Sequence, residues 1–262
     1  MDVQTRADNG DTAAQLELAR GYEREDKADL ARGWYARAAQ GGDAGALRCL
    51  AASLLTQPPM APRDGVEMMR EAAQRGDGDA ALICAVIAAQ DTALQDRWDV
   101  AWQYQQMAAA NGSAPAQAAG ALLPRSGLAV PPSAHLMFDT PRIEVCPGFA
   151  SQQECRWLMD RATPQLKAAQ LYDPVSGGGF RGETIRNNSD ASFDLVHSDL
   201  VIALLRSRIA AWTGLDIQAM EPPMGCATRK ASIFRRIATR WIPAFRPWQS
   251  RSAARASVWP RC

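Results

Sequence analysis

The chain lacks any long apolar segment. No run of about 18 uninterrupted apolar residues occurs among its 262 residues, so a transmembrane helix is not expected. Residues 1–12 are polar and of mixed charge, which argues against a secretory signal peptide. We therefore expect a cytoplasmic protein that does not bind membranes. Its apolar content of 47% is ordinary for a globular fold.

The cysteines lack the spacing of a metal or redox motif. There are six of them, and no two form a Cys-x-x-Cys pair. A chain of 28.4 kDa buries enough apolar surface to fold without disulfides, so we expect reduced thiols.

Acidic residues are absent from the last 41 positions, 222–262. This segment carries Lys230, eight arginines and three of the eight tryptophans, a net charge of +9, whereas residues 1–221 have a net charge of −8. A folded domain does not normally change composition so abruptly. The segment is therefore either a specialised basic arm or a stretch translated out of frame.

What the sequence does contain is an internal repeat. The segment 38–43, Ala-Ala-Gln-Gly-Gly-Asp, recurs after 34 residues at 72–77 and more loosely at 108–113. A glycine lies near the end of each copy, where a left-handed helix cap belongs, and a helix of small residues follows at 44–55, 80–89 and 114–122. Before each copy, apolar residues three and four positions apart predict a helix with one buried face. These residues are Ala31, Trp34, Tyr35 and Ala38; Val66, Met69, Ala72 and Ala73; and Ala101, Tyr104, Met107 and Ala108.

This pattern resembles the Sel1-like repeat family. The segment 28–39 matches the second helix of that unit, which ends in Ala-Ala-x-x-Gly, and the first helix is matched by Leu16, Ala19, Gly21 and Tyr22. The resemblance implies a TPR-like α-solenoid over residues 10–123, whose concave side contacts a protein partner. We interpret the aromatic residues of the repeats as packing between helices, and we expect so short an array to dock onto the next domain.

A linker is expected at 124–135, where prolines and a glycine gather. Beyond it, 141–149 predicts a short strand with a turn, and Ser151 with Glu154 predicts the capping box of a helix. Next come a strand over 166–173, a flexible glycine loop at 177–179 and a helix over 198–213 that ends at Gly214. The inward residues of the two helices are predicted to be Cys155, Leu158, Met159 and Ala162, and Val201, Leu204, Leu205, Ile209 and Trp212.

In this order the pieces resemble the opening half of the prolyl 4-hydroxylase-like iron(II) and 2-oxoglutarate dioxygenases. The matching positions are Pro141, Ile143, 149–151, Glu154, Cys155, Leu158, Arg186, 208–210, 213–215 and Glu221. The resemblance implies that residues 136–222 are the first part of an α+β double-stranded β-helix, or jelly roll. It also implies protein or peptide hydroxylation with Fe(II), 2-oxoglutarate and ascorbate.

That chemistry requires a His-x-Asp pair and a distant histidine, which together hold iron on one face. The family has its first pair soon after the position of Glu221. The two histidines of this chain, His135 and His197, precede that position, and neither begins His-x-Asp. We expect both to be surface or capping side chains. No catalytic or metal-binding residue is therefore assigned, the cofactor-binding residues are unknown, and none of the cofactors is expected to bind the chain as written.

A change of reading frame offers an explanation. With GC-rich codons assumed, a shift of one nucleotide turns 225–231 into V-R-Y-A-Q-G and 231–240 into E-H-F-P-P-H-R-D-S. The same frame turns 255–262 into G-Q-R-V-A-T-L. These phrases resemble the missing part of the dioxygenase family. We therefore expect residues 223–262 to be out of frame and poorly ordered.

Three functions compete at this point. The first is a dioxygenase-related protein that has lost its iron site, and the second is a non-enzymatic protein-interaction module built from the repeats. The third is a nucleic-acid binder, in which tail arginines neutralise phosphates and Trp241, Trp248 and Trp259 stack on bases. The tail arginines form no helical stripe and no recognition fold accompanies them. We therefore do not expect nucleic acid as a partner.

Overall fold

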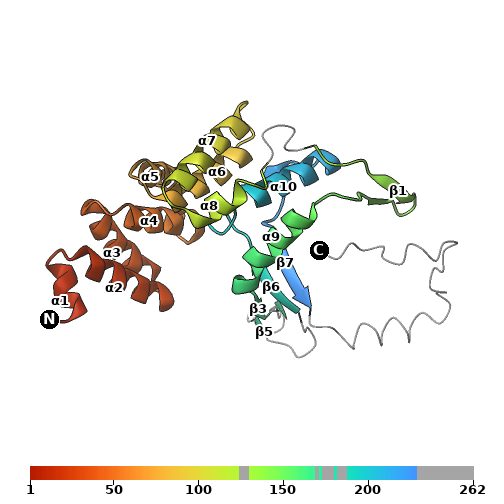
Figure 1. Ribbon diagram of the computed structural model, residues 1–262. Helices are drawn as coiled ribbons and strands as arrows, with labels where there is room; N and C mark the ends of the chain where they lie inside the picture. Colours follow the sequence, from red (N-terminus) through yellow and green to blue (C-terminus); the bar gives the residue numbers. More distant parts are fainter. Residues whose placement is uncertain (124–129, 169–170, 173–179, 182–187, 229–262) are drawn as a thin grey trace. The chain divides into compact units, whose positions relative to one another are not determined.

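The computed structural model describes residues 1–123, 130–168, 171–172, 180–181 and 188–228 (Figure 1). They form two compact units, one made of 1–149 with 193–223 and the other of 150–192 with 224–228. Arg186, the glycine loop at 177–179 and residues 229–262 of the predicted tail, with its three tryptophans, lie outside the described residues, whereas residues 224–228 of that tail are described and form a strand.

The first unit is built on a series of helical hairpins. Its helices are α1 (Val3–Asp8), α2 (Thr12–Arg24), α3 (Ala28–Gln40), α4 (Ala44–Thr56), α5 (Pro62–Gln74), α6 (Gly78–Gln90), α7 (Arg97–Ala110) and α8 (Ala114–Ala119). Each helix contacts the next one along the chain, and no strand occurs within residues 1–123. The predicted repeat of helical hairpins is confirmed.

The same turn joins the helices of every hairpin that the repeat predicted. Gly42, Gly76 and Gly112 have φ between +85° and +96°, the left-handed region that favours glycine. Gly10, between α1 and α2, has φ +89°, so the structure adds a fourth copy of the turn. An aspartate follows Gly10, Gly42 and Gly76, and the side chains of Asp11, Asp43 and Asp77 each accept a hydrogen bond from a backbone amide of the helix that they cap. These aspartates give the repeats a common register.

The buried faces of the array follow the predicted pattern with one exception. Tyr35 and Met69 are fully buried, whereas Met107, expected to face inward, is 37% exposed. That prediction is wrong because the position of Tyr35 and Met69 in the third repeat is Gln105. The amide of Gln105 is buried and donates to the carbonyl of Ala116 at 2.8 Å, which satisfies the donor.

Helix α10 (Leu200–Thr213) belongs to the same unit and contacts α6. The predicted inward residues Val201, Leu204 and Leu205 are buried, and Gly214 closes the helix at φ +72°. All residues from Leu200 to Leu205 are buried, so the first half of the helix is covered on every side. Ile209 and Trp212 are half-buried. The 3-10 helix η2 (Ile217–Ala219) follows.

A β-hairpin precedes the second unit. Strands β1 (His135–Phe138) and β2 (Ile143–Val145) pair in antiparallel fashion, with His135 opposite Val145. The short strand predicted within 141–149 is β2, and His135 begins β1.

The second unit combines one α-helix with small antiparallel sheets. Its elements are α9 (Gln152–Ala162), η1 (Thr163–Gln165), β3 (Lys167–Ala168), β4 (Leu171–Tyr172), β5 (Phe180–Arg181), β6 (Asn188–Ser192) and β7 (Met224–Thr228). Strands β3, β6 and β7 form one sheet, and β4 pairs with β5. Within the range 166–173, where one strand was predicted, the described residues include β3 and β4, which belong to different sheets.

The predicted capping box of α9 is confirmed, with Ser151 and Glu154 bonding reciprocally. Cys155 is buried as predicted, but Met159 is 43% exposed, because the strands that α9 contacts, β6 and β7, are short. A double-stranded β-helix requires two sheets of longer strands facing each other. The described residues form no such arrangement, and the described part of the chain shows no jelly roll.

Candidate interaction surface

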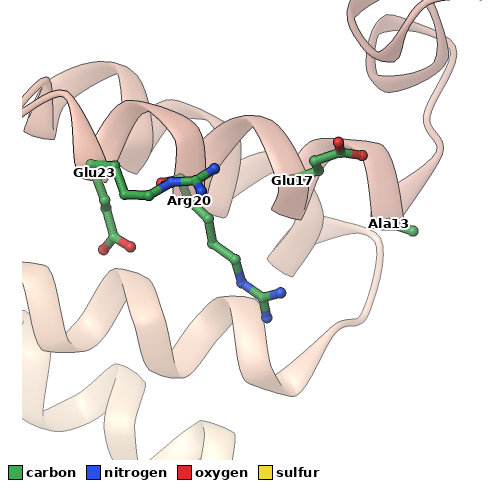
Figure 2. A pocket seen from close by; sticks show the side chains of 5 residues that line it. Ala13, Glu17, Arg20 and Glu23 are labelled. Carbon is green, nitrogen blue, oxygen red and sulfur yellow. The ribbon is translucent and has the colours of Figure 1, made fainter.

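The side chains of α2 form an open hollow of about 650 Å³. We call it the charged hollow, and Ala13, Glu17, Arg20, Glu23 and Arg24 line it (Figure 2). Most of these residues are three or four positions apart, which places them on one side of the helix. Other α2 residues, Ala14 and Ala19, are fully buried against the array. The array therefore turns a mixed-charge face of α2 to solvent.

Glu23 in this hollow is fixed by the array itself. The hydroxyl of the buried Tyr35 donates to its carboxylate at 2.7 Å. Burial, together with this bond, raises the pKa of Tyr35 far above its usual range, so the hydroxyl stays protonated and keeps donating. Arg24 is turned along the helix by a bond from its Nε to the carbonyl of Arg20 at 3.2 Å. Two carboxylates and two guanidinium groups thus line one concave surface.

The nearby thiol is not equipped for chemistry. Cys49 on α4 is half-buried, and burial raises its pKa despite the opposing charge of Arg48. A thiol with a raised pKa is mostly protonated near neutral pH and is a poor nucleophile. Arg48 itself pairs with Asp77 at 3.1 Å, which connects α4 to the cap of α6. These groups serve packing and capping.

The register of the capping aspartates shows how the same surface changes along the array. The sixth residue after Asp11, Asp43 and Asp77 is Glu17, Cys49 and Ile83 respectively. Glu17 is exposed, Cys49 is half-buried and Ile83 is buried. The ninth residues after the same aspartates are Arg20, Ala52 and Val86, and they too are exposed, half-buried and buried respectively.

The helix that carries the apolar residues of this series, α6, is in contact with another helix of the same chain. Helix α6, which carries Ile83 and Val86, contacts α10. At the last residue of α6, the side-chain oxygen of Gln90 accepts a hydrogen bond from Arg206 of α10 at 3.1 Å. The position that is charged and open on α2 is therefore apolar and covered on α6.

Neither histidine takes part in a metal site among the described residues. His135 lies in β1, and His197 precedes α10, where its ring Nδ1 lies 2.7 Å from Asp194. Burial opposes ionisation of Asp194, but hydrogen bonds from His197 outweigh it and lower the carboxyl pKa. No group of three His, Cys, Asp or Glu side chains in the described part of the chain has metal-binding geometry. These residues do not fit an iron facial triad.

The sequence assigned no site residue, and it missed the charged hollow. The signal was present in the repeat register, since Glu17 and Arg20 occupy positions at which the later repeats have small or apolar residues. Within the described residues, no helix combines the length and the apolarity needed to cross a bilayer.

Comparison with known proteins gives little similarity. No protein-family model matches the chain, and no curated protein matches it. Among solved structures, the chain is similar to a Sel1 repeat protein from Oxalobacter formigenes, with 23% sequence identity and a TM-score of 0.40. The match covers 44% of this chain and spans half, 50%, of that protein.

Proposed function

We propose that the helical array is a protein-interaction module that binds a polypeptide segment of a partner at the charged hollow of α2. The observation that carries this proposal is the contact between α6 and α10. The array already holds a helix of its own chain against α6, whose Ile83 and Val86 are buried, while the equivalent positions of α2, Glu17 and Arg20, are exposed and charged. We infer that the same side of the array binds a helix at α6 through apolar residues and a segment of a partner at α2 through charged residues.

The chemistry of the hollow favours a segment with charges of both signs. Arg20 and Arg24 would pair with carboxylates of the partner, and Glu17 with a basic side chain. Each exposed ion pair contributes little to the binding free energy. The charged residues of the site are therefore expected to determine which partner binds more than how tightly it binds.

A peptide library displayed on phage and selected against the full chain tests this function. We expect enriched peptides to bind the wild type and to lose at least tenfold in affinity for Arg20→Glu, a change of about 1.4 kcal/mol. The control variant Arg63→Glu reverses an exposed charge on α5 and is expected to bind as the wild type does. Enriched peptides that bind Arg20→Glu and the wild type equally would contradict the proposal.

The dioxygenase resemblance of residues 136–222 rests on the sequence alone. We infer that the chain as written does not turn over 2-oxoglutarate, because its two histidines lack the His-x-Asp pattern and do not fit an iron triad. The interaction module is therefore the function that the described residues support best.

A further inference from the structure

The contact between α6 and α10 includes a polar anchor. A terminal nitrogen of the Arg206 guanidinium donates to the side-chain oxygen of Gln90, the last residue of α6, at 3.1 Å. The other terminal nitrogen donates to the carbonyls of Ile217 and Met220, which follow α10, at 3.2 and 3.0 Å. Because Arg206 is half-buried and held from its own side, it presents one defined donor to α6.

The repeat places Arg24 of α2 at the position that Gln90 has in α6. Each is the thirteenth residue after its capping aspartate, Asp11 or Asp77. The exchange reverses the chemistry of the position, because the side-chain oxygen of glutamine accepts a hydrogen bond whereas a guanidinium group only donates. A helix docked on α2 as α10 docks on α6 would therefore need an acceptor where α10 has Arg206.

Two further charged residues lie on the same side of α2. Glu17 and Arg20 are exposed (Figure 2), and their side chains form no hydrogen bond or ion pair with any described residue. They are three positions apart, a spacing at which opposite charges on a helix can pair, yet they do not pair with each other. Glu23, by contrast, is bonded to Tyr35. One carboxylate, of Glu17, and two guanidinium groups, of Arg20 and Arg24, are therefore available to a partner.

We propose that the partner segment at the charged hollow is a helix, docked on α2 in the position that α10 has on α6. This inference rests on the proposed function and adds the conformation and the charge pattern of the partner. Opposite Arg20 and Arg24 the helix carries two carboxylates, three or four positions apart, so that both lie on one face. One turn beyond the carboxylate at Arg20, a basic residue of the helix faces Glu17.

Helix α10 itself does not have this charge pattern. Its residues 200–213 include no Asp or Glu, and its charged residues are Arg206 and Arg208. Those two guanidinium groups would repel Arg20 and Arg24. The charges of α2 therefore exclude α10 of a second copy while they accept an acidic helix, so that the two docking positions of the array select different helices.

Helix α5 of a second copy comes closer to the pattern. Arg63, Glu67 and Glu71 follow one another at intervals of four positions, and all three are exposed. The carboxylate of Glu71, however, is already paired with Arg75 at 2.6 Å. A second copy thus offers one of the two carboxylates unpaired. The occupant that fits the site is a helix of a different protein, with both carboxylates unpaired.

A designed helix is the probe for this site. An alanine-rich peptide of about 18 residues, a length at which a helix forms in water, carries one lysine and two glutamates at successive intervals of four positions. A second peptide has the three charges in reverse order, which covers both directions of the partner helix. At low ionic strength, we expect one of the two labelled peptides to bind the full chain saturably. Replacing its central alanine by proline, which breaks the helix, is expected to weaken binding at least tenfold.

Charge reversal on both sides of the contact supplies the matched variants. Arg24→Glu is expected to weaken binding of this peptide at least tenfold. A peptide with lysine in place of the outer glutamate, which faces residue 24, is expected to restore binding to that variant. The control Arg63→Glu is expected to bind the original peptide as the wild type does. Arg24 and Arg63 are both exposed, so neither substitution disturbs the packing of the array.

The outcomes separate this inference from the proposed function. Library peptides that lose affinity for Arg20→Glu but tolerate a central proline would support the proposed function and overturn the helical partner. Absence of saturable binding by either designed helix, or equal binding by Arg24→Glu and wild type, would also overturn it. Self-association of the wild type that Arg24→Glu and Arg63→Glu each abolish would identify α5 of a second copy as the occupant, with the same consequence.

Discussion

At the scale of single residues, the space around each glycine decides what the array tolerates. Gly78 lies at the start of α6, where a Cβ would come within 2.8 Å of the carbonyl of Asn111 and 2.9 Å of that of Ala108. Both obstacles are backbone atoms, which cannot rotate away. At Gly21 and Gly33 the surroundings are open, so only the conformational entropy of glycine matters there.

The substitution Gly78→Ala is expected to lower the free energy of unfolding by about 1–3 kcal/mol, as overpacking of a tight contact does. By contrast, Gly33→Ala is expected to raise it by roughly 0.5–1 kcal/mol, because alanine favours the helix. Urea denaturation followed by circular dichroism measures both. Similar changes in the two variants would mean that the contact between α6 and the turn after α7 is looser than described.

Cysteine labelling reports on packing at the same scale. Cys84 in α6 is 2% exposed, and burial raises its pKa to about 12. Cys226 in β7 is exposed. With iodoacetamide at pH 8, which attacks through the thiolate, Cys226 is expected to be modified first and Cys84 only after unfolding in urea. Peptide mass spectrometry follows both sites, and equal rates in the folded protein would contradict the burial of α6.

At the scale of elements, docking of α10 on α6 is the contact that a local pattern does not reveal. The hairpins were predictable because a repeated phrase, a glycine and a capping aspartate lie within a few residues of each other. The partners α6 and α10 lie more than 100 residues apart, and each is simply apolar. The burial of Gln105 was not predicted either. Its polar side chain gives no apolar pattern, and its inward position follows only from its alignment with Tyr35 and Met69 in the repeat. The charged hollow could likewise have been predicted only by aligning the repeats on their capping aspartates.

Truncating a core residue of α10 tests that docking. Leu204 is fully buried, so Leu204→Ala is expected to cost about 2–5 kcal/mol of local stability. In hydrogen exchange, amides of α10 and α6 are expected to lose protection, while those of α2 and α3 keep theirs. The control Ala211→Ser changes an exposed position of α10 and is expected to leave exchange unchanged. Uniform loss of protection across the array would show that it unfolds as one cooperative unit.

At the scale of the whole molecule, the abrupt change of charge near Pro222 is explained by our hypothesis of a shifted reading frame, which can be tested on the gene. The nucleotide sequence around the codons for Met224 and Gly225 tests the frameshift hypothesis directly. We expect that one insertion or deletion there restores a reading frame with His-x-Asp. A gene in which no single-nucleotide change restores that motif would favour an evolved basic segment instead.

The activity of the full chain gives an independent test. With Fe(II), 2-oxoglutarate and ascorbate, we expect oxygen consumption at the rate of the protein-free control, because the sequence lacks an open-sided metal site. A gene with the frame restored is the matched control, and it is expected to consume oxygen if the family resemblance is correct. Turnover by the chain as written would overturn our interpretation of its tail.

The contact between α6 and α10 also has a consequence during synthesis. Each hairpin of the array packs on its sequence neighbours, so it can fold as soon as it leaves the ribosome. Helix α10 is made about 110 residues after α6 ends at Gln90. At ordinary rates of translation this is a delay of about 5–20 s. Throughout that interval the part of α6 that contacts α10 lacks this cover, and we expect a chaperone that binds apolar segments to engage the nascent chain there.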